Sequence, residues 1–211
     1  MRMGSGARTQ PPGGRTAPET RRLTDFKLVR SLYRSRLKKD FAPNELKPLS
    51  AMRRAWERGA YDCYGLFGGE EILGYAFFVR NGRDRLLDYF AIAEDCRGGG
   101  LGSAFLRQLA GCIADADCVV AEAEDPDTAP DAETRELRER RLRFYERNGY
   151  IVTGLKAVVF GADYRILEAP ASAAPHAEDA LRAVYTELYR SILPELFFRT
   201  QFRVSQEPEK N

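Results

Sequence analysis

Apolar residues along the chain recur with two different spacings. Residues 49–58 carry Leu49, Met52 and Trp56 at the interval of a helix face, whereas residues 61–67 alternate with a period of two. These patterns, interrupted by turn residues, predict one sheet with helices around it. In chain order we expect a strand at 24–30, helices at 31–40 and 49–58, strands at 61–67, 71–79 and 85–92, a helix ending near 114, a strand at 118–123, a helix at 132–148, and strands at 150–158 and 160–168.

The two ends of the chain differ from this central region. Residues 1–20 are rich in Gly, Pro, Arg and Thr without apolar periodicity, which predicts a disordered tail. Residues 21–169 form the expected domain. Residues 170–211 begin with an Ala/Pro linker and continue as an amphipathic helix at 177–192, which Pro194 ends. We expect this helix to pack on its own domain; completion of a substrate pocket and pairing in a homodimer are the alternatives.

Composition narrows the class of protein. The 211 residues, 44% of them apolar, can bury the core of one domain. The net charge of +2 comes without a basic stripe interleaved with aromatic residues, which argues against a nucleic-acid partner. The sequence contains neither an apolar stretch of about 18 residues nor an apolar signal core. We therefore expect a cytoplasmic protein that does not interact with a membrane.

Cysteine and histidine restrict the available chemistry. The four cysteines, Cys63, Cys96, Cys112 and Cys118, lack C-x-x-C spacing, so we expect free thiols and no metal site. The single histidine, His176, lies in the Ala/Pro linker and is expected to take no part in function. Any general base is then a carboxylate, a water molecule or another group.

A glycine-rich run is the most informative local motif. Residues 97–102 read Arg-Gly-Gly-Gly-Leu-Gly, after a strand-like stretch at 86–92 and before a helix-like stretch at 103–109. The first N–H groups of a helix have no internal acceptor, the helix dipole favours anions there, and glycine lets a phosphate approach the backbone. No lysine follows as in a P-loop, and the third glycine of a dinucleotide fingerprint is missing. The spacing R-x-x-G-x-G predicts a different phosphate-bearing ligand.

A second motif lies near the end of the helix predicted at 132–148. Residues 143–150 read Arg-Phe-Tyr-Glu-Arg-Asn-Gly-Tyr, and Asn148 and Gly149 are suited to a helix C-terminus because both tolerate the left-handed conformation. Tyr145 lies one turn before that end. An aromatic ring packed on the sheet is one interpretation of Tyr145, and a functional hydroxyl group is the other.

Together the two motifs resemble the GNAT superfamily of N-acetyltransferases. The pyrophosphate loop of that superfamily reads (Gln/Arg)-x-x-Gly-x-(Gly/Ala), which Arg97, Gly100 and Gly102 match, and the predicted element order over residues 23–169 agrees with the family. The resemblance implies a mixed α/β fold of the GNAT acyl-CoA N-acyltransferase type. Its central sheet is mixed and mostly antiparallel, with flanking helices, and the strand at 85–92 splays from the strand at 118–123. A C-terminal helical extension follows this fold.

The resemblance also implies roles for individual residues. Tyr145 is the expected general acid, and the base is expected among Glu124, Asp88 and Glu122, with Glu124 favoured. Arg138 and Arg141 depart from the asparagine and the small residue of many family members, so contact of this helix with the cofactor would be made by arginine. The expected acetyl-CoA-binding residues are Phe90, Ala91, Ile92, Arg97, Gly98, Gly99, Gly100, Leu101, Gly102, Ser103 and Arg141.

The expected activity is transfer of an acetyl group from acetyl-CoA to a primary amine of a small molecule or peptide. Two alternatives remain on the same fold: an acyl-CoA-binding regulatory or interaction module without catalysis, and a transferase of longer acyl groups. The acceptor pocket is expected to have an aromatic, partly polar wall that includes Tyr33, Trp56, Tyr164 and Arg165.

Overall fold

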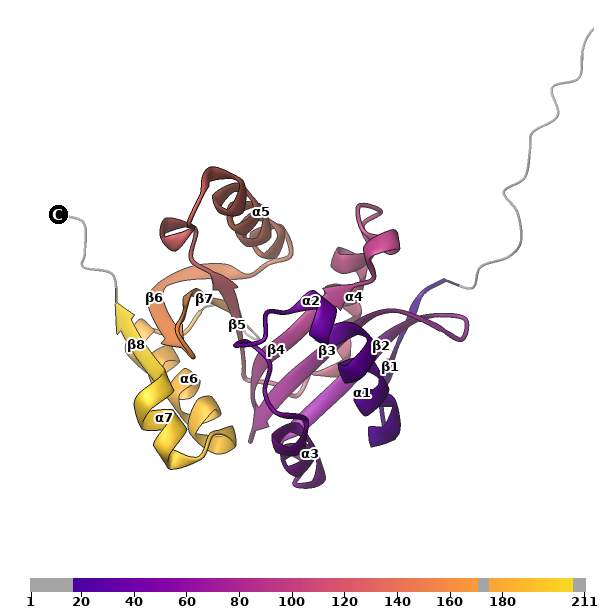
Figure 1. Cartoon of the computed structure of the whole chain (residues 1–211), viewed down its shortest axis with the longest axis horizontal. Helices are drawn as coiled ribbons and strands as arrows, with labels where there is room; N and C mark the ends of the chain where they lie inside the picture. Colours follow the sequence, from indigo (N-terminus) through magenta and orange to yellow (C-terminus); the bar gives the residue numbers. More distant parts are fainter. Residues whose placement is uncertain (1–16, 171–174, 207–211) are drawn as a thin grey trace, which may run out of the picture.

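A computed structural model describes residues 17–170 and 175–206 (Figure 1). Its centre is an eight-stranded sheet in the order β1-β2-β3-β4-β5-β7-β6-β8, antiparallel throughout except for the β4–β5 pair. The mixed, mostly antiparallel sheet is therefore confirmed. The strands are β1 (Glu19–Arg22), β2 (Tyr61–Gly68), β3 (Glu71–Asn81), β4 (Asp84–Ile92), β5 (Cys118–Glu124), β6 (Ile151–Val159), β7 (Ala162–Pro170) and β8 (Phe202–Gln206).

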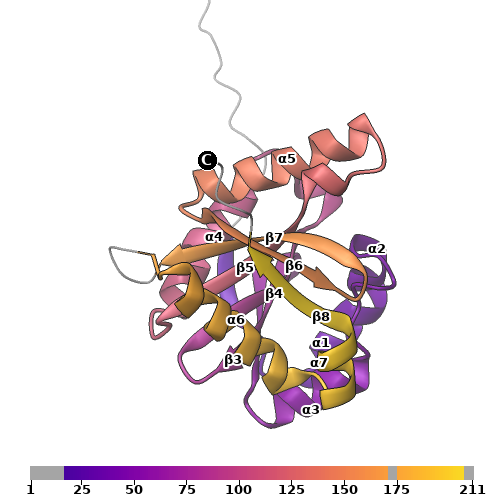
Figure 2. The same ribbon diagram turned by 90° about the vertical axis from the view of Figure 1, so that its left-hand side faces the viewer.

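Helices cover both faces of this sheet, as Figures 1 and 2 show. One apolar core lies between the sheet and helices α1, α3 and α6, and a second lies between the sheet and helices α4 and α5. The helices are α1 (Phe26–Leu32), the π-helical η1 (Tyr33–Leu37), α2 (Lys38–Asp40), α3 (Leu49–Glu57), α4 (Leu101–Cys112), α5 (Ala132–Arg147), α6 (Glu178–Ile192) and α7 (Glu195–Gln201), with short 3₁₀ turns η2 (Glu94–Cys96) and η3 (Pro126–Thr128). None of the helices in the described ranges is long and apolar enough to cross a membrane.

The sequence pattern misplaces the first strand. Helix α1 occupies the range predicted as a strand, because Asp25 caps it by accepting a hydrogen bond from the Lys27 N–H at 2.8 Å. Val29 and Leu32, three residues apart, are both buried on its inner face. The actual strand, β1, begins at Glu19, inside the range expected to be a tail. The other tail residues, 1–16, lie outside the described residues.

The C-terminal extension is helical as expected and also contains a strand. Helix α6 buries Leu181 and Leu188, together with two tyrosines, against the sheet of its own chain, which is the packing we expect. Strand β8 then pairs antiparallel with β6, with Phe202 opposite Val159. Phe198 stacks on Phe202 at 5.2 Å between ring centroids, so α7 and β8 pack against each other. Residues 171–174 and 207–211 of the extension lie outside the described part of the chain.

The sheet splits where β4 and β5 separate. These two parallel strands pair only from Asp84 opposite Cys118 to Leu87 opposite Ala121. Beyond that point both strands continue without pairing with each other. A bulge leaves Asp88 without a partner in the β3 register, between Leu87 and Tyr89. Bulges bend a strand and are over-represented beside active sites. The predicted splay is therefore confirmed, and it opens the sheet at its centre.

Candidate functional site

A cavity of about 600 Å³ opens at this split. Its walls come from the segment after α2, the ends of β4 and β5, the start of α4, the C-terminal half of α5, the β6–β7 turn and α6. All the residues that the sequence predicts for cofactor binding and catalysis line it, except Gly99. They are Asp88, Phe90, Ala91, Ile92, Arg97, Gly98, Gly100, Leu101, Gly102, Ser103, Glu122, Glu124, Arg141 and Tyr145.

The glycine loop forms one end of the cavity. Gly98 and Gly100 have φ angles of 85° and 78°, in the left-handed region that favours glycine. The first hydrogen bond of α4 runs from the Ala104 N–H to the Gly100 carbonyl at 3.0 Å, so the N–H groups of residues 101–103 precede the helical ladder. A Cβ atom placed at Gly98, Gly99 or Gly100 would meet nothing within 4 Å. The loop is therefore an open cradle of backbone donors at a helix N-terminus.

Arg97 fixes the rim of this cradle. Its Nε donates a hydrogen bond to the Ile92 carbonyl at 2.9 Å, which ties the loop to the end of β4. A terminal guanidinium nitrogen lies 3.4 Å from an Asp40 carboxylate oxygen on α2. The Arg97 side chain remains 54% exposed, so its charge is directed partly toward solvent and partly toward Asp40. This arrangement places a cation beside the glycine loop.

An aromatic layer supports the backbone of β4 along the split. Phe90 stacks on Phe105 of α4 and Phe144 of α5, with centroid distances of 5.6 and 6.0 Å. A Cβ atom at Gly102 would come within 3.2 Å of the Phe144 ring, so α4 and α5 approach each other at a glycine. On the open side of β4, the backbone groups beyond Leu87 have no β5 partner. An extended ligand could therefore pair with this edge.

Tyr145 lies on the last turn of α5 and lines the cavity. Its ring is 6% exposed and contacts Phe144 and Tyr150 edge to face. Within the described ranges its hydroxyl group has no hydrogen-bond partner, although Tyr145 lines the cavity. Burial raises the pKa of Tyr145 to about 12, an effect that Arg141 opposes and Glu122 reinforces. The hydroxyl group is therefore a proton donor that stays protonated through neutral pH.

Glu122 lies across the split, on the free end of β5. Its Oε1 accepts hydrogen bonds from the hydroxyl groups of Tyr185 and Tyr189, the latter at 2.7 Å, both from α6. Its Oε2 has no hydrogen-bond partner among the described residues. Burial raises the pKa of Glu122, the two tyrosines and Lys47 lower it, and Asp88 raises it. The net result is a carboxyl group with a raised pKa and one oxygen free.

The other two candidate carboxylates are more completely bound. Asp88, at the bulge, bonds the Lys47 ammonium with one oxygen and the Tyr61 hydroxyl with the other. Its side chain is 2% exposed, and that of Lys47 is 12% exposed. Lys47 also lies above the rings of Tyr89 and Tyr189, 5.7 and 5.6 Å from their centroids. Both oxygens of Asp88 are therefore occupied by side chains of the protein, one of them the Lys47 cation.

Glu124 is clamped between two arginines of α5. Arg138 contacts its Oε1 at 2.9 Å, and Arg141 contacts its Oε2 at 2.7 Å. A second Arg138 nitrogen donates to the Asp125 carbonyl at 2.8 Å. The two arginines that depart from the usual residues of the family thus fasten α5 to the end of β5. Of the two, only Arg141 also lines the cavity.

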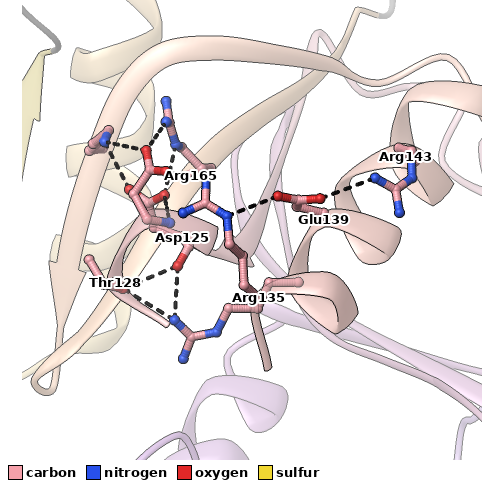
Figure 3. A network of polar contacts seen from close by, with 9 residues as sticks. Asp125, Thr128, Arg135, Glu139, Arg143 and Arg165 are labelled. Atoms are coloured by element: carbon pink, nitrogen blue, oxygen red, sulfur yellow. Dashed lines mark hydrogen bonds and ion pairs between the residues drawn. The ribbon is translucent and has the colours of Figure 1, made fainter. Parts of the chain in front are cut away.

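A polar network holds the β5–α5 connection in place (Figure 3). Asp125, 2% exposed, accepts from Arg165 of β7 at 3.1 Å and pairs with Lys156 of β6 at 2.9 Å. Burial raises the pKa of Asp125, but the hydrogen bonds from Lys156, the Asp127 backbone and Arg165 outweigh it, so the pKa is lowered. The network continues through Asp127 to Arg135 at 3.2 Å. Arg165 therefore belongs to this support and does not line the cavity.

Sequence reasoning missed several residues on the Glu122 side of the cavity. Tyr189 lines the cavity, and Tyr185 and Tyr189 both hold Glu122, yet in the sequence they mark only a helix face in an extension. No motif or apolar periodicity in the sequence pointed to Lys47, because it lies in the loop between α2 and α3. Among the expected wall residues, Tyr164 lines the cavity, but Tyr33 and Trp56 do not. Tyr33 donates to the Lys47 carbonyl at 3.1 Å, and Trp56 packs on Phe26.

Comparisons with known proteins agree with this geometry. Residues 60–152 match the family model described as an acetyltransferase (GNAT) domain. A comparison with curated proteins found no match. Among solved structures, one from Bacteroides thetaiotaomicron, assigned to the GNAT family of acetyltransferases, is 18% identical over 85% of this chain and 98% of its own, with a TM-score of 0.65.

Two further structures have named activities. The ribosomal-protein-S18-alanine N-acetyltransferase from Escherichia coli is 17% identical over 75% of this chain and 97% of its own, with a TM-score of 0.53. An aminoglycoside 6'-N-acetyltransferase complexed with coenzyme A is 14% identical over 74% and 99%, with a TM-score of 0.54. At these identities the likeness concerns the fold. The split sheet and its glycine loop define an acyl-CoA N-acyltransferase fold. The chain thus resembles the GNAT acetyltransferases in two respects, the family-model match over residues 60–152 and the fold.

Proposed function

We propose that this protein transfers the acetyl group of acetyl-CoA to a primary amine, with Tyr145 as general acid and Glu122 as general base. One observation carries the proposal. A single cavity brings together an open phosphate cradle, a strand edge without a β5 partner, and two groups that keep a free oxygen among the described residues: a tyrosine hydroxyl and a half-buried carboxylate. These are the parts that acyl transfer from a thioester to an amine requires.

The residues of the cradle fit the cofactor. The N–H groups of residues 101–103 would bind its diphosphate, and Arg97 and Arg141 would add positive charge. The free edge of β4 around Phe90 and Ile92 would pair with the pantetheine arm and place a backbone N–H near the thioester carbonyl. Bound acetyl-CoA supplies the acetyl group as an activated thioester.

Tyr145 would donate its hydroxyl proton to the leaving sulfur. Its pKa of about 12 keeps the phenol protonated in the resting site. Because the hydroxyl group has no other hydrogen-bond partner among the described residues, it is free to bond a sulfur atom in the cavity. The phenolate would then recover its proton from solvent or from the proton that the base has taken.

Glu122 would accept the proton that the incoming ammonium must lose. We assign this role to Glu122 rather than to Glu124, because both oxygens of Glu124 are bound by arginine and both oxygens of Asp88 are also bound. The raised pKa of Glu122 brings its basicity closer to the working pH. A carboxylate facing Tyr189 and Tyr164 also suits a cationic amine, from a small molecule or a peptide N-terminus.

A thiol-release assay with acetyl-CoA against a panel of primary amines tests the activity. The panel should include aminoglycosides, polyamines, amino acids and short peptides, with propionyl-CoA as an alternative donor. With the best acceptor, Tyr145→Phe should lower kcat by on the order of 100-fold, the lower range for general acid catalysis. Its affinity for coenzyme A should stay within about twofold of the wild-type value, because the hydroxyl group contacts only the reacting end.

Tyr150→Phe is the matched control. Tyr150 packs against Tyr145 at 5.1 Å but does not line the cavity, so its variant should retain wild-type kcat. An unchanged kcat in Tyr145→Phe would remove this residue from the mechanism. Coenzyme A binding measured by calorimetry, with no turnover on any amine, would instead support a binding module without catalysis.

A further inference from the structure

A second cluster of reactive side chains lies at the opposite end of β5 and β7 from the split. Cys118 begins β5, Glu168 is near the end of β7, and His176 lies two residues before α6. Cys118 and Glu168 are both fully buried, and the His176 side chain is 33% exposed. Cys118 and Glu122 are four residues apart on one strand, a span of roughly 13 Å, so the cluster is separate from the candidate active site.

The cluster brings three kinds of metal-binding atom together. The Cys118 Sγ, a Glu168 carboxylate oxygen and the His176 Nδ1 all lie within 4.8 Å of one another. The Sγ–Oε1 distance is 3.7 Å, close to the roughly 3.5 Å expected between neighbouring ligands of a tetrahedral zinc ion. The Oε1–Nδ1 distance is 2.5 Å, so the histidine ring would turn outward to widen it.

The burial of Glu168 is the independent reason to expect a cation here. A fully buried carboxylate is unfavourable unless a positive charge compensates it. In the described part of the chain no lysine or arginine pairs with Glu168; its partners are the His176 ring, the His176 backbone N–H and the Cys118 thiol. A divalent ion would supply the positive charge that His176 provides only when protonated, and the exposed side of His176 gives it a path from solvent.

We propose that Cys118, Glu168 and His176 form a binding site for Zn²⁺ or a similar thiophilic divalent cation, with water as the fourth ligand. Thiolate, imidazole and carboxylate are the three ligand types that zinc uses in proteins. Binding would release the thiol proton and any proton shared between Glu168 and His176 to solvent. The sequence analysis predicted no metal site, because strand pairing rather than cysteine spacing brings these three residues together.

The position of His176 would connect a bound metal ion to helix α6. It lies two residues before α6, and α6 delivers Tyr185 and Tyr189 to Glu122. A metal bound to His176 and to two sheet strands would tether the start of that helix. We therefore expect the ion to act as a structural clamp on the C-terminal extension, at a distance from the reacting atoms.

Metal binding to the full chain, without acetyl-CoA or amine, tests the proposal separately from the acetyltransferase activity. After chelation, equilibrium dialysis should find one Zn²⁺ per chain, and Co²⁺ should give a thiolate-to-cobalt charge-transfer band. Cys118→Ser and His176→Ala should both lose the band. Cys112→Ser is the matched control, because Cys112 is an exposed cysteine at the end of α4 and should leave the band unchanged.

Comparison of the two ligand variants distinguishes loss of metal binding from a folding defect. His176 lies outside the regular elements, so His176→Ala should keep the wild-type circular dichroism spectrum even if Cys118→Ser does not. Zinc should raise the melting temperature of the wild-type chain and not that of His176→Ala. If no charge-transfer band forms, or if His176→Ala binds the metal as tightly as the wild type, the cluster is a His176–Glu168 hydrogen bond only and the proposal is wrong.

Discussion

The two ends of the cavity are built in different ways. At the glycine loop, backbone N–H groups at a helix start and one arginine form the site, and all of them lie within residues 97–103. At the proposed acceptor end, the polar groups are side chains from distant segments: Glu122 comes from β5, its two tyrosines come from α6, and Asp88 pairs with a loop lysine. The first site is local in sequence, and the second exists only after the chain has folded.

The two ends should also differ in the substitutions that they tolerate. A backbone site depends on the absence of side chains, so substitution of a glycine damages it directly. A side-chain site depends on how much each carboxylate is already bound. Among the described residues Glu122 keeps one oxygen free, whereas Glu124 keeps none, although the two lie two residues apart on the same face of β5. Changes at each end should therefore affect different kinetic constants.

The largest effect is expected from Glu122→Gln. Glutamine keeps the shape of the side chain but accepts a proton poorly, so kcat/KM should fall by about 1,000-fold, within the range for removal of a general base. Glu124→Gln is the matched comparison and should lose less than about tenfold, because it loosens α5 without removing the base. Steady-state kinetics with one amine measures both. A larger loss in Glu124→Gln than in Glu122→Gln would overturn the assignment of the base.

Gly100→Asp should break the other end of the cavity. A carboxylate beside the expected diphosphate repels it by about 3 kcal/mol at short range, so the Kd for coenzyme A should rise on the order of 100-fold. Gly111→Asp makes the same chemical change at the far end of α4, where a Cβ atom also meets nothing within 4 Å, and should leave the Kd unchanged. Calorimetry distinguishes the two. Equal affinities in both variants would contradict the phosphate loop.

The same contrast between local and long-range signals explains how much of the structure could be predicted from the sequence. Elements whose signals are local were predicted correctly: α3, the β2–β4 strands and the glycine loop before α4. The first strand was wrong because residues 26–29 are apolar enough for either structure, and the Asp25 cap with buried Val29 and Leu32 decides for a helix. Propensity at such positions yields to tertiary packing.

The proposed acceptor site depends on contacts between residues far apart in the chain. The carboxylates of β5 could be named from the sequence, but which of them is free depends on Arg138 and Arg141 in α5 and on Tyr189 in α6. A period of 3.6 identifies the apolar face of α6 without saying what its hydroxyl groups bind. Strand β8 was missed for a similar reason, because its pairing with β6 is a long-range contact.

The smallest effect, and the most specific, is expected on the pH dependence. The Tyr185 and Tyr189 hydroxyl groups lower the pKa of Glu122, which burial raises. Tyr189→Phe removes one of these hydrogen bonds, so the pKa of Glu122 rises further and the acid limb of the kcat/KM profile moves to higher pH. A bond worth about 1 kcal/mol corresponds to a shift of about 0.7 pH unit.

The acid limb is read with one amine whose own ionisation is the same in every experiment, so only the protein changes between profiles. Tyr150→Phe, which removes a buried hydroxyl group outside the cavity, should leave the limb in place. Tyr185→Phe should move it in the same direction as Tyr189→Phe, because both hydroxyl groups bind the same Glu122 oxygen. A limb that moves to lower pH, or that does not move in either variant, would show that the titrating group is not Glu122. The C-terminal extension would then shape the acceptor end of the cavity without tuning its base.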